Sequence, residues 1–219
     1  MNKLLKRTLW LLLFAPVAYL IVVWKKLPDT VPMHFDHHGN PDRYGNKAEL
    51  WATAAIMTIA GIGTYLLITN IHRIDPKRYA REMQDKYDKI AATVVIFLSA
   101  IHFFIILSAE KGHIVFGSGL ILAAVSVLLA VLGNYMYNIK PNYFVGIRIP
   151  WTLENEDNWK KTHNLAGRLW FTGGILMAIL TALLPSTAGV IVFFTGIVIL
   201  TIIPVVYSYR IFVRSKNNK

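Results

Sequence analysis

Hydrophobic residues along this chain gather in long continuous runs rather than in short alternating segments. A helix needs about 20 apolar residues to cross the hydrocarbon core of a bilayer. Runs that reach or approach this length lie at about residues 8–24, 50–71, 90–108, 114–137, 169–184 and 188–209. The pattern therefore predicts an all-α integral membrane protein with six transmembrane helices, folded as a single polytopic domain over residues 1–219.

The first run and the last two runs have features of their own. Residues 8–24 are predicted to form a membrane anchor rather than a cleaved signal peptide, because no small-residue cleavage site follows and more spans come after them. Pro185 interrupts the last two runs, whose combined length is nearly twice one bilayer crossing. These two runs are predicted to form a tight helical hairpin.

The basic residues are distributed unevenly between the connections. Of the 23 Lys and Arg residues, eighteen lie in the N-terminal segment, the second and fourth connections and the C-terminal tail, and five lie in the first and third connections. Since Lys and Arg favour the cytoplasmic side, both termini and the loop 138–168 are predicted to be cytoplasmic and the loop 25–49 to be outside. Membrane contact also explains the net charge of +11, so no direct nucleic-acid binding is expected.

The loop 138–168 contains the run KPNYFVGIRIPWTLENEDNWKKTH. Pro141 and Pro150 favour extended conformations in the residues before them, and Gly146 permits a turn that other residues avoid. Acidic residues after Thr152 suit the first turn of a helix, so Thr152 is predicted to be its N-cap.

Trp159 and His163 fall on one face of this predicted helix, together with Trp170. That face is predicted to lie along the membrane surface before the chain enters the next span. Arg148 and Trp151 are candidate anchors for a partner or an anionic headgroup, with simple anchoring at the membrane interface as the alternative. The predicted partner-binding residues are Lys140, Pro141, Asn142, Gly146, Arg148, Pro150, Trp151, Thr152, Trp159 and His163.

The loop 25–49 contains the segment VPMHFDHH, in which apolar and polar residues alternate as in a β-strand. If the strand continues far enough, His34, Asp36 and His38 share one face and offer the ligands of a zinc or iron site. A structural role is favoured instead, because Gly39 and the residues after it predict a turn. His102 is a further candidate, since an ionisable residue within a span is often functional, but a hydrogen bond from a neutral His102 to a neighbouring helix is the favoured role.

Catalytic and cofactor-binding motifs are missing from the sequence. It has no phosphate-binding glycine loop, nucleophile elbow or HExxH pair, and without cysteine it has no disulfide, iron–sulfur cluster or thiolate zinc site. We therefore expect neither an enzyme nor a bound cofactor.

Two segments resemble one known family. The run KPNYFVGIRIPWTLENEDNWKKTH, with Gly133 and Asn134 before it and Gly167 and Arg168 after it, resembles the signature of the SdpI family of bacterial membrane immunity proteins. The segment LPDTVPMHFDHHGNPDRYGNK resembles the uncharacterised N-terminal domain common in that family. In this segment the likeness rests on His34, Phe35, Gly39, Pro41 and Asp42. Ile149 departs from the pattern, which has a small polar residue at that position.

The resemblance implies a function. Proteins similar to SdpI sit in the bacterial cytoplasmic membrane and protect the cell from a secreted membrane-active peptide toxin. Some also hold a cognate transcriptional repressor at the membrane. The implied partners are the lipid bilayer, a toxin outside and a soluble repressor inside. The competing hypothesis is a transporter or membrane-embedded metal-dependent enzyme for a small or lipid-like substrate.

Overall fold

A computed structural model describes residues 3–77, 79 and 81–217 of the chain. Arg78 and Lys219, which contribute to the uneven distribution of basic residues, lie outside this part. The described elements are α1 (Lys3–Val23), β1 (Thr30–Phe35), β2 (Pro41–Asn46), α2 (Glu49–Thr69), α3 (Ile71–Ile74), α4 (Gln84–Lys111), α5 (Ser118–Met136), α6 (Pro150–Glu154), α7 (Glu156–Leu183) and α8 (Ser186–Asn217).

Long apolar helices dominate the molecule, and the predicted six-helix membrane fold is confirmed. Within the described residues, six helices are long and apolar enough to span a bilayer. Several extend beyond the predicted apolar runs: α4 begins at Gln84, α7 begins at Glu156 and α8 continues to Asn217. A helix can continue past the hydrocarbon core because its backbone hydrogen bonds are internal, whatever the polarity of its side chains.

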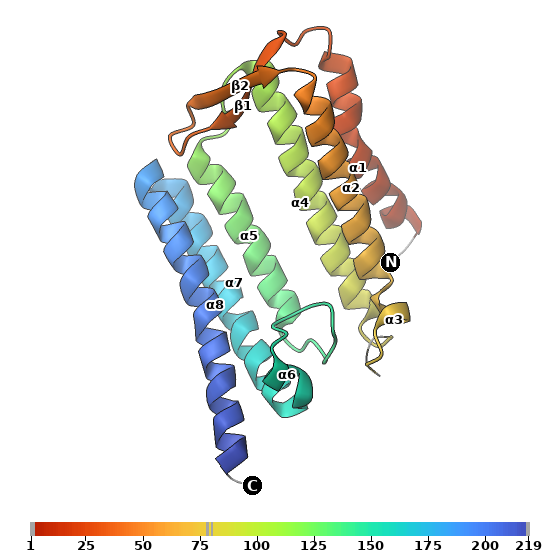
Figure 1. Ribbon diagram of the computed structural model, residues 1–219, viewed down its shortest axis with the longest axis vertical. Helices are drawn as coiled ribbons and strands as arrows, with labels where there is room; N and C mark the ends of the chain where they lie inside the picture. Colours follow the sequence, from red (N-terminus) through yellow and green to blue (C-terminus); the bar gives the residue numbers. More distant parts are fainter. Residues whose placement is uncertain (1–2, 78, 80, 218–219) are drawn as a thin grey trace.

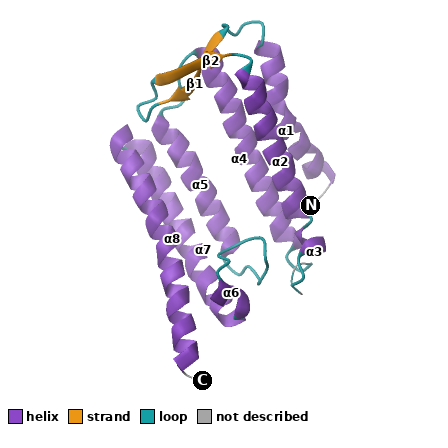
Figure 2. Cartoon of the chain, viewed as in Figure 1, coloured by secondary structure: helices purple, strands orange, loops and turns teal. Residues whose placement is uncertain are grey.

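The six long helices form two units of three (Figures 1 and 2). Helices α1, α2 and α4 pack together, and so do α5, α7 and α8, while α4 and α5 make the contact between the units. Close packing of α5 on α7 depends on small residues. A Cβ atom at Gly133 would lie 2.6 Å from the backbone nitrogen of Phe171, and one at Gly174 would lie 2.7 Å from the carbonyl oxygen of Ser126.

A two-stranded antiparallel hairpin interrupts the helical pattern between α1 and α2. It covers one end of the helices (Figure 2). Strand β1 corresponds to the predicted alternating segment, and Thr30 pairs with Asn46. Val31 is fully buried and packs with Leu50 and Ile106, so β1 is held on the first three-helix unit by an apolar contact.

The two ends of the molecule differ in what they carry. The hairpin lies at one end, which we call the hairpin end, and both chain termini lie toward the other, which we call the termini end (Figure 1). The short helices α3 and α6 also lie at the termini end, with the loop that joins α5 to α6.

Candidate functional site

The loop from Tyr137 to Ile149, which we call the 137–149 loop, folds back over the beginning of α7. Helix α5 ends at Met136, and Asn138 turns the chain with a positive φ of 60°. Asparagine tolerates this left-handed conformation better than most residues do. The loop therefore leaves α5 sharply and lies on the helix that follows it, rather than extending into solvent.

Trp159 and His163 of α7 hold both halves of this loop. Trp159 Nε1 donates a hydrogen bond to the Ile139 carbonyl at 2.8 Å, and the Ile147 amide donates to His163 Nε2 at 2.8 Å. Since Nε2 accepts, Nδ1 carries the hydrogen, which it donates to the Trp159 carbonyl at 2.8 Å. The two rings stack with centroids 3.9 Å apart, and both side chains are fully buried.

Protein covers this face, so its side chains are not open to the membrane surface. The 137–149 loop lies over Trp159 and His163 and takes up their polar atoms. That the helix itself lies along the membrane surface stays a prediction. A helical period identifies which residues share a face, but it does not say whether lipid or protein covers that face.

Gly146 is the point at which the loop passes closest to the histidine ring. Its φ is 117°, a conformation that side chains rarely adopt, and a Cβ atom there would overlap His163 Nε2. The predicted glycine turn is therefore present, and two independent constraints require a glycine in it.

Asn142 organises the loop from within. Its side chain is fully buried and makes four hydrogen bonds to the loop backbone. The amide nitrogen Nδ2 donates to the carbonyls of Lys140 and Val145, and the oxygen Oδ1 accepts from the amides of Phe144 and Val145. A buried side chain that satisfies so many backbone groups fixes the conformation of the loop.

The N-cap of the helix is Asn155 rather than the predicted Thr152. Asn155 Oδ1 accepts a hydrogen bond from the Asn158 amide at 2.9 Å. Thr152 instead lies in α6, fully buried. Its hydroxyl lies 2.8 Å from the carbonyl oxygens of Ile147 and Ile149. Pro150 starts α6 early, so the hydroxyl that was expected to begin the long helix closes the loop instead.

Side chains of α4 and of the connection before it bind the loop and α6 from the other side. Asp75 accepts a hydrogen bond from the Tyr143 amide at 3.0 Å. Lys86 Nζ lies 3.0 Å from the Tyr137 carbonyl and 3.1 Å from that of Asn138. Lys77 Nζ donates to the Leu153 carbonyl at 3.3 Å. At the termini end the loop backbone therefore links the two units, together with the Lys77–Leu153 bond to α6 and a hydrogen bond from the Tyr79 hydroxyl to Glu156 of α7.

The exposed part of the loop is smaller than the predicted binding set. Lys140, Arg148 and Pro150 are exposed, whereas Pro141, Asn142, Thr152, Trp159 and His163 are buried. Gly146 is half-buried. Arg148 Nη1 donates to the Tyr143 carbonyl at 2.6 Å, which orients the guanidinium at the surface.

Trp151 does not stand beside Arg148 as an open binding face. Its ring is half-buried and packs on α8, stacked on Phe212 at 5.9 Å and edge-on to Tyr209 at 5.5 Å. Its Nε1 is buried, with no hydrogen-bond partner among the described residues.

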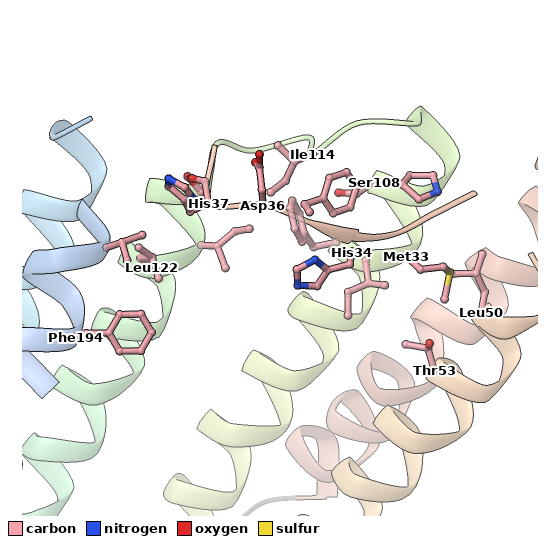
Figure 3. Close-up of a pocket in the computed structure, with 17 residues that line it drawn as sticks. Met33, His34, Asp36, His37, Leu50, Thr53, Ser108, Ile114, Leu122 and Phe194 are labelled. Atoms are coloured by element: carbon pink, nitrogen blue, oxygen red, sulfur yellow. The ribbon is translucent and has the colours of Figure 1, made fainter. Parts of the chain in front are cut away.

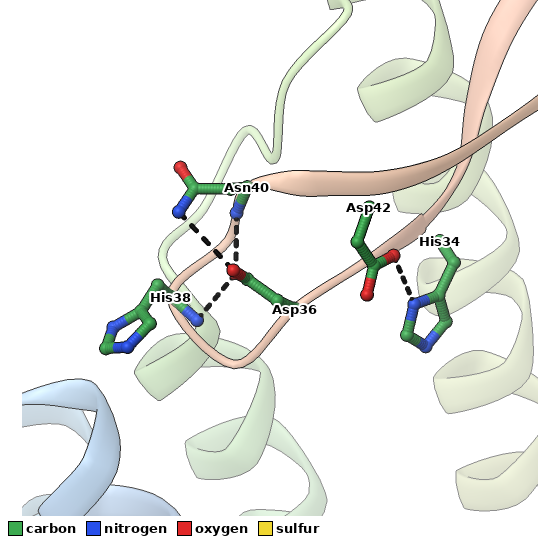
Figure 4. Close-up of polar contacts among 5 residues, drawn as sticks. All are labelled: His34, Asp36, His38, Asn40 and Asp42. Carbon is green, nitrogen blue, oxygen red and sulfur yellow. Dashed lines mark hydrogen bonds and ion pairs between the residues drawn. The ribbon is translucent and has the colours of Figure 1, made fainter.

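At the hairpin end, the family-like residues lie at the tip of the hairpin and next to it. Figure 4 shows His34 and Asp42 among them. His34 Nδ1 and Asp42 Oδ1 are 2.6 Å apart across the two strands. Phe35 pairs with Pro41 next to the tip. Gly39 has a φ of 89°, and a Cβ atom there would lie 2.7 Å from Ile114 Cγ2.

The three candidate metal ligands do not come together. Asp36 Oδ1 accepts hydrogen bonds from the amides of His38 at 2.9 Å and Asn40 at 2.8 Å, while His34 faces Asp42 (Figure 4). The Asn40 N–H group holds the pKa of Asp36 below its usual range. Across the described chain, no three His, Asp or Glu side chains are grouped to hold a metal ion. The alternation predicted a shared face, but the turn bends Asp36 back onto its own backbone.

His102 is buried in α4, 2% exposed, with Nε2 lacking a hydrogen-bond partner in the described part of the chain. It belongs to α4 and lies outside both family-like segments of the sequence.

Comparison with known proteins gives two family matches. Residues 138–208 match the SdpI/YfhL protein family. The matched residues make up about a third of the chain. That region comprises the 137–149 loop almost entirely, α6, α7 and most of α8. Residues 11–58 match a domain of unknown function, DUF1648, which covers most of α1, the hairpin and the beginning of α2. The resemblance inferred from the two sequence segments is confirmed.

Two curated relatives are similar over shorter stretches. "Immunity protein SdpI" of Bacillus subtilis (strain 168) is 33% identical over 57 residues, which is 26% of this chain and 28% of that protein. An uncharacterised protein of Archaeoglobus fulgidus is 38% identical over 61 residues, which is 28% of this chain and 33% of that protein. The matched stretches thus span about a third or less of either relative. No solved structure matches.

Sequence reasoning missed several residues that hold this site. Asn158 is buried between α7 and α8, where Nδ2 donates to the Ser208 carbonyl at 3.1 Å and Oδ1 accepts from the hydroxyls of Thr162 and Ser208. The spacing of Asn158 and Thr162, polar residues one helical turn apart beside the face of Trp159 and His163, was a usable signal. Asp75 and Lys86 gave no comparable signal, because their partners lie more than fifty residues away in the chain.

Proposed function

We propose that this protein is a membrane immunity protein that protects a bacterial cell from a secreted, membrane-active peptide toxin. The observation that carries the proposal is the SdpI family match over residues 138–208, because those residues form one continuous structure of loop and helices. A relative named "Immunity protein SdpI" supports the same role. The role is one of binding, with no chemical reaction and no cofactor.

The proposed location is the bacterial cytoplasmic membrane, with the termini end inside and the hairpin end outside. The basic residues support this orientation, since those beside α1, α4, α7 and the end of α8 outnumber those near the hairpin. The chain has no cysteine, so single cysteines can report on it. His38→Cys should react with an impermeant maleimide in intact cells, and Glu154→Cys and Asn217→Cys should react only after permeabilisation. Labelling of Glu154→Cys from outside would reverse the orientation.

The immunity role is tested by deletion in the chain's own host. Loss of the gene should sensitise the cells to at least one membrane-active peptide in a panel that includes the host's own secreted peptides. Expression of the chain should restore survival. Equal survival of the deleted and complemented strains against the whole panel would refute the immunity role.

We further propose that the exposed part of the 137–149 loop holds a soluble transcriptional repressor at the membrane. Lys140, Tyr143 and Arg148 form an exposed surface on a loop whose conformation is fixed from beneath. A planar guanidinium can pair with a carboxylate in a bidentate way, which a lysine cannot do. A fixed loop also costs little entropy on binding.

Arg148→Lys tests this surface, because it keeps the charge and removes the planar group. The repressor candidate is a helix-turn-helix protein encoded beside the gene, and its membrane-bound fraction is the measurement. Truncating a central interface residue costs about 2 kcal/mol, or roughly thirtyfold in affinity. We expect Arg148→Lys to release the repressor while the exposed Arg210→Lys on α8 does not. Normal retention in Arg148→Lys at normal abundance would exclude this binding surface.

A further inference from the structure

A cavity of about 660 Å³ lies directly beneath the hairpin, and we call it the hairpin cavity. Figure 3 shows the side chains that surround it. The hairpin forms its roof, and its walls come from both three-helix units: α2 and α4 on one side, α5 and α8 on the other. The cavity thus occupies the place at the hairpin end that a packed interface between the two units would fill.

The cavity is apolar within and polar at its roof. Leu50, Leu122 and Phe194 are among the apolar side chains that line its walls. Asp36 is the one formally charged side chain among the described lining residues, and it belongs to the roof. His37, also in the roof, is tied to α5 through its carbonyl oxygen, which accepts from the Ser118 hydroxyl at 2.7 Å. A ligand that fits must therefore be apolar on its buried side. Asp36 turns its carboxylate toward the amides of the hairpin turn and away from the cavity (Figure 3), so its negative charge favours a cation on the outer side of the roof.

The depth of the cavity limits what can occupy it. The lining residues reach from Ser108 to Phe104 on α4 and from Ser118 to Leu122 on α5, four residues in each case. At 1.5 Å per residue this is a depth of about 6 Å below the hairpin. The cavity is therefore wide and shallow, at the level where the apolar helices meet the polar hairpin.

We propose that the hairpin cavity binds the apolar side chains of a cationic amphipathic peptide that lies in the membrane interface. Such peptides carry Lys and Arg on one face and Leu, Phe or Trp on the other, and they sink about 5–10 Å into the bilayer. Both the depth and the single acidic roof residue match this ligand. A lipid acyl chain extends through half of a hydrocarbon core of about 30 Å, much deeper than this cavity reaches.

This inference rests on the proposed immunity role and names the part of the molecule that would take up the toxin. It also states which property of the toxin is recognised: the amphipathic character of the peptide rather than one particular amino-acid sequence. Apolar side chains in a groove supply affinity, and the carboxylate at the edge selects for positive charge.

A fluorescent label within the cavity tests the proposal directly. Thr53 is half-buried in the wall, so Thr53→Cys, the single cysteine of the chain, can carry a bimane label in phospholipid nanodiscs. The probe is a synthetic 18-residue Leu/Lys amphipathic helix with one Trp, whose indole quenches bimane on contact. We expect saturable quenching by this peptide and at least about tenfold weaker quenching by the matched Leu/Glu peptide.

Neighbouring positions on α8 provide a matched pair of variants. Val190 lines the cavity, whereas Ile191 is 61% exposed on the outer surface of the helix. Val190→Phe should fill part of the cavity and weaken peptide binding about tenfold, and Ile191→Phe should leave it unchanged. Gel filtration and thermal unfolding of both variants identify a variant that has simply failed to fold. In that event Leu122→Phe, from α5, takes the place of Val190→Phe.

Nanodiscs made with brominated acyl chains distinguish the lipid alternative. If the peptide occupies the cavity, it should protect the label from quenching by bromine. Bromine quenching that the peptide does not change, or equal peptide binding by Val190→Phe and Ile191→Phe, would overturn the inference. The two proposals can fail separately. If cells that carry a folded Val190→Phe variant are still protected, the cavity is not the toxin-binding site, but the immunity role stands. If the protein binds the peptide but does not protect cells, the immunity role is rejected, but the binding site stands.

Discussion

The two ends of this molecule join the same two helix units in different ways. At the termini end the 137–149 loop lies between the units, and buried groups such as Asn142 and His163 hold its backbone with hydrogen bonds of 2.6–3.0 Å. At the hairpin end the units are bridged by a roof, fixed by the Ser118–His37 hydrogen bond and by Gly39 against Ile114. Beneath that roof, between the two units, lies a cavity.

The two ends should therefore differ in how well they tolerate substitutions. A buried polar network costs much free energy when any one member is lost, so the termini end should tolerate few substitutions. An apolar cavity under a roof leaves free volume that a ligand can fill, and its lining should tolerate changes of moderate size. Substitutions of the same kind at the two ends can therefore test the comparison.

The largest effect is expected from Gly146→Ala at the termini end. The new Cβ meets the rigid His163 ring, and a φ of 117° is strained for alanine, so the free energy of unfolding should fall by about 3 kcal/mol. Gly63→Ala is the control, because a Cβ there meets nothing within 4 Å. Thermal unfolding in detergent measures both variants. A loss for Gly146→Ala no larger than that for Gly63→Ala would mean that the loop is not held on α7.

Asn142→Ala should give the next largest loss. It removes both donors and the acceptor that hold the loop backbone, and leaving buried groups unsatisfied costs about 2 kcal/mol. Asn134→Ala, at an exposed position of α5, should change little. Thermal unfolding measures the loss of stability, and limited proteolysis tests the loop, which should become cleavable in Asn142→Ala. Resistance equal to that of Asn134→Ala would contradict the account of a loop organised from within.

Gly39→Ala should have a smaller effect, although this glycine also has a positive φ and a close neighbour. Its neighbour is the Cγ2 methyl group of Ile114, which lies in the connection between α4 and α5 and can shift with it, so the cost is about 1 kcal/mol, mainly from backbone strain. Gly117→Ala is the control at the same end, where a Cβ meets nothing within 4 Å. Thermal unfolding gives the loss of unfolding free energy for Gly39→Ala and for Gly117→Ala, and both are compared with the loss for Gly146→Ala. If Gly39→Ala equals or exceeds Gly146→Ala, the hairpin end is the more tightly constrained one.

The smallest effect is a local response of the hairpin tip to acid. Because the pKa of Asp36 is lowered by hydrogen bonds from backbone amides, its stabilisation of the tip is present above the unfolded pKa of about 3.9. It is lost as the pH falls through the lower, folded pKa. Amide hydrogen exchange at His38 and Asn40 should therefore accelerate, relative to its intrinsic rate, only below about pH 4. In Asp36→Asn the acceleration of exchange below about pH 4 should be missing. If the acceleration is unchanged in this variant, another group is responsible for it.

Several parts of the candidate site could be predicted from the sequence. The glycine turn at Gly146 and the strand that begins at Thr30 follow from local conformational preferences, which are properties of the residues themselves. The helix with Glu156 and Asp157 in its first turn was predicted too, although its cap was placed three residues early. Pro150 explains the displacement, because it starts a separate short helix that takes up Thr152.

Other parts could not be predicted, because they depend on which segments meet. Alternation placed His34, Asp36 and His38 on one face, but the tip of the hairpin gave Asp36 two backbone amides of its own to accept from. The helical period placed Trp159 and His163 together, and only the fold decided that the 137–149 loop covers them. The predicted membrane-facing surface thus became the interior of the site.

Apolar run length and local motifs are enough to establish the membrane class, the six long helices and the two family-like segments. The division of the helices into two units, tied by Asp75 and Lys86 at one end and enclosing a cavity at the other, is known from their packing alone. The physical reason is that helix formation within a bilayer is satisfied by hydrogen bonds inside each segment. The choice of neighbours depends instead on small residues, buried polar groups and loop backbones that meet across long separations in the chain.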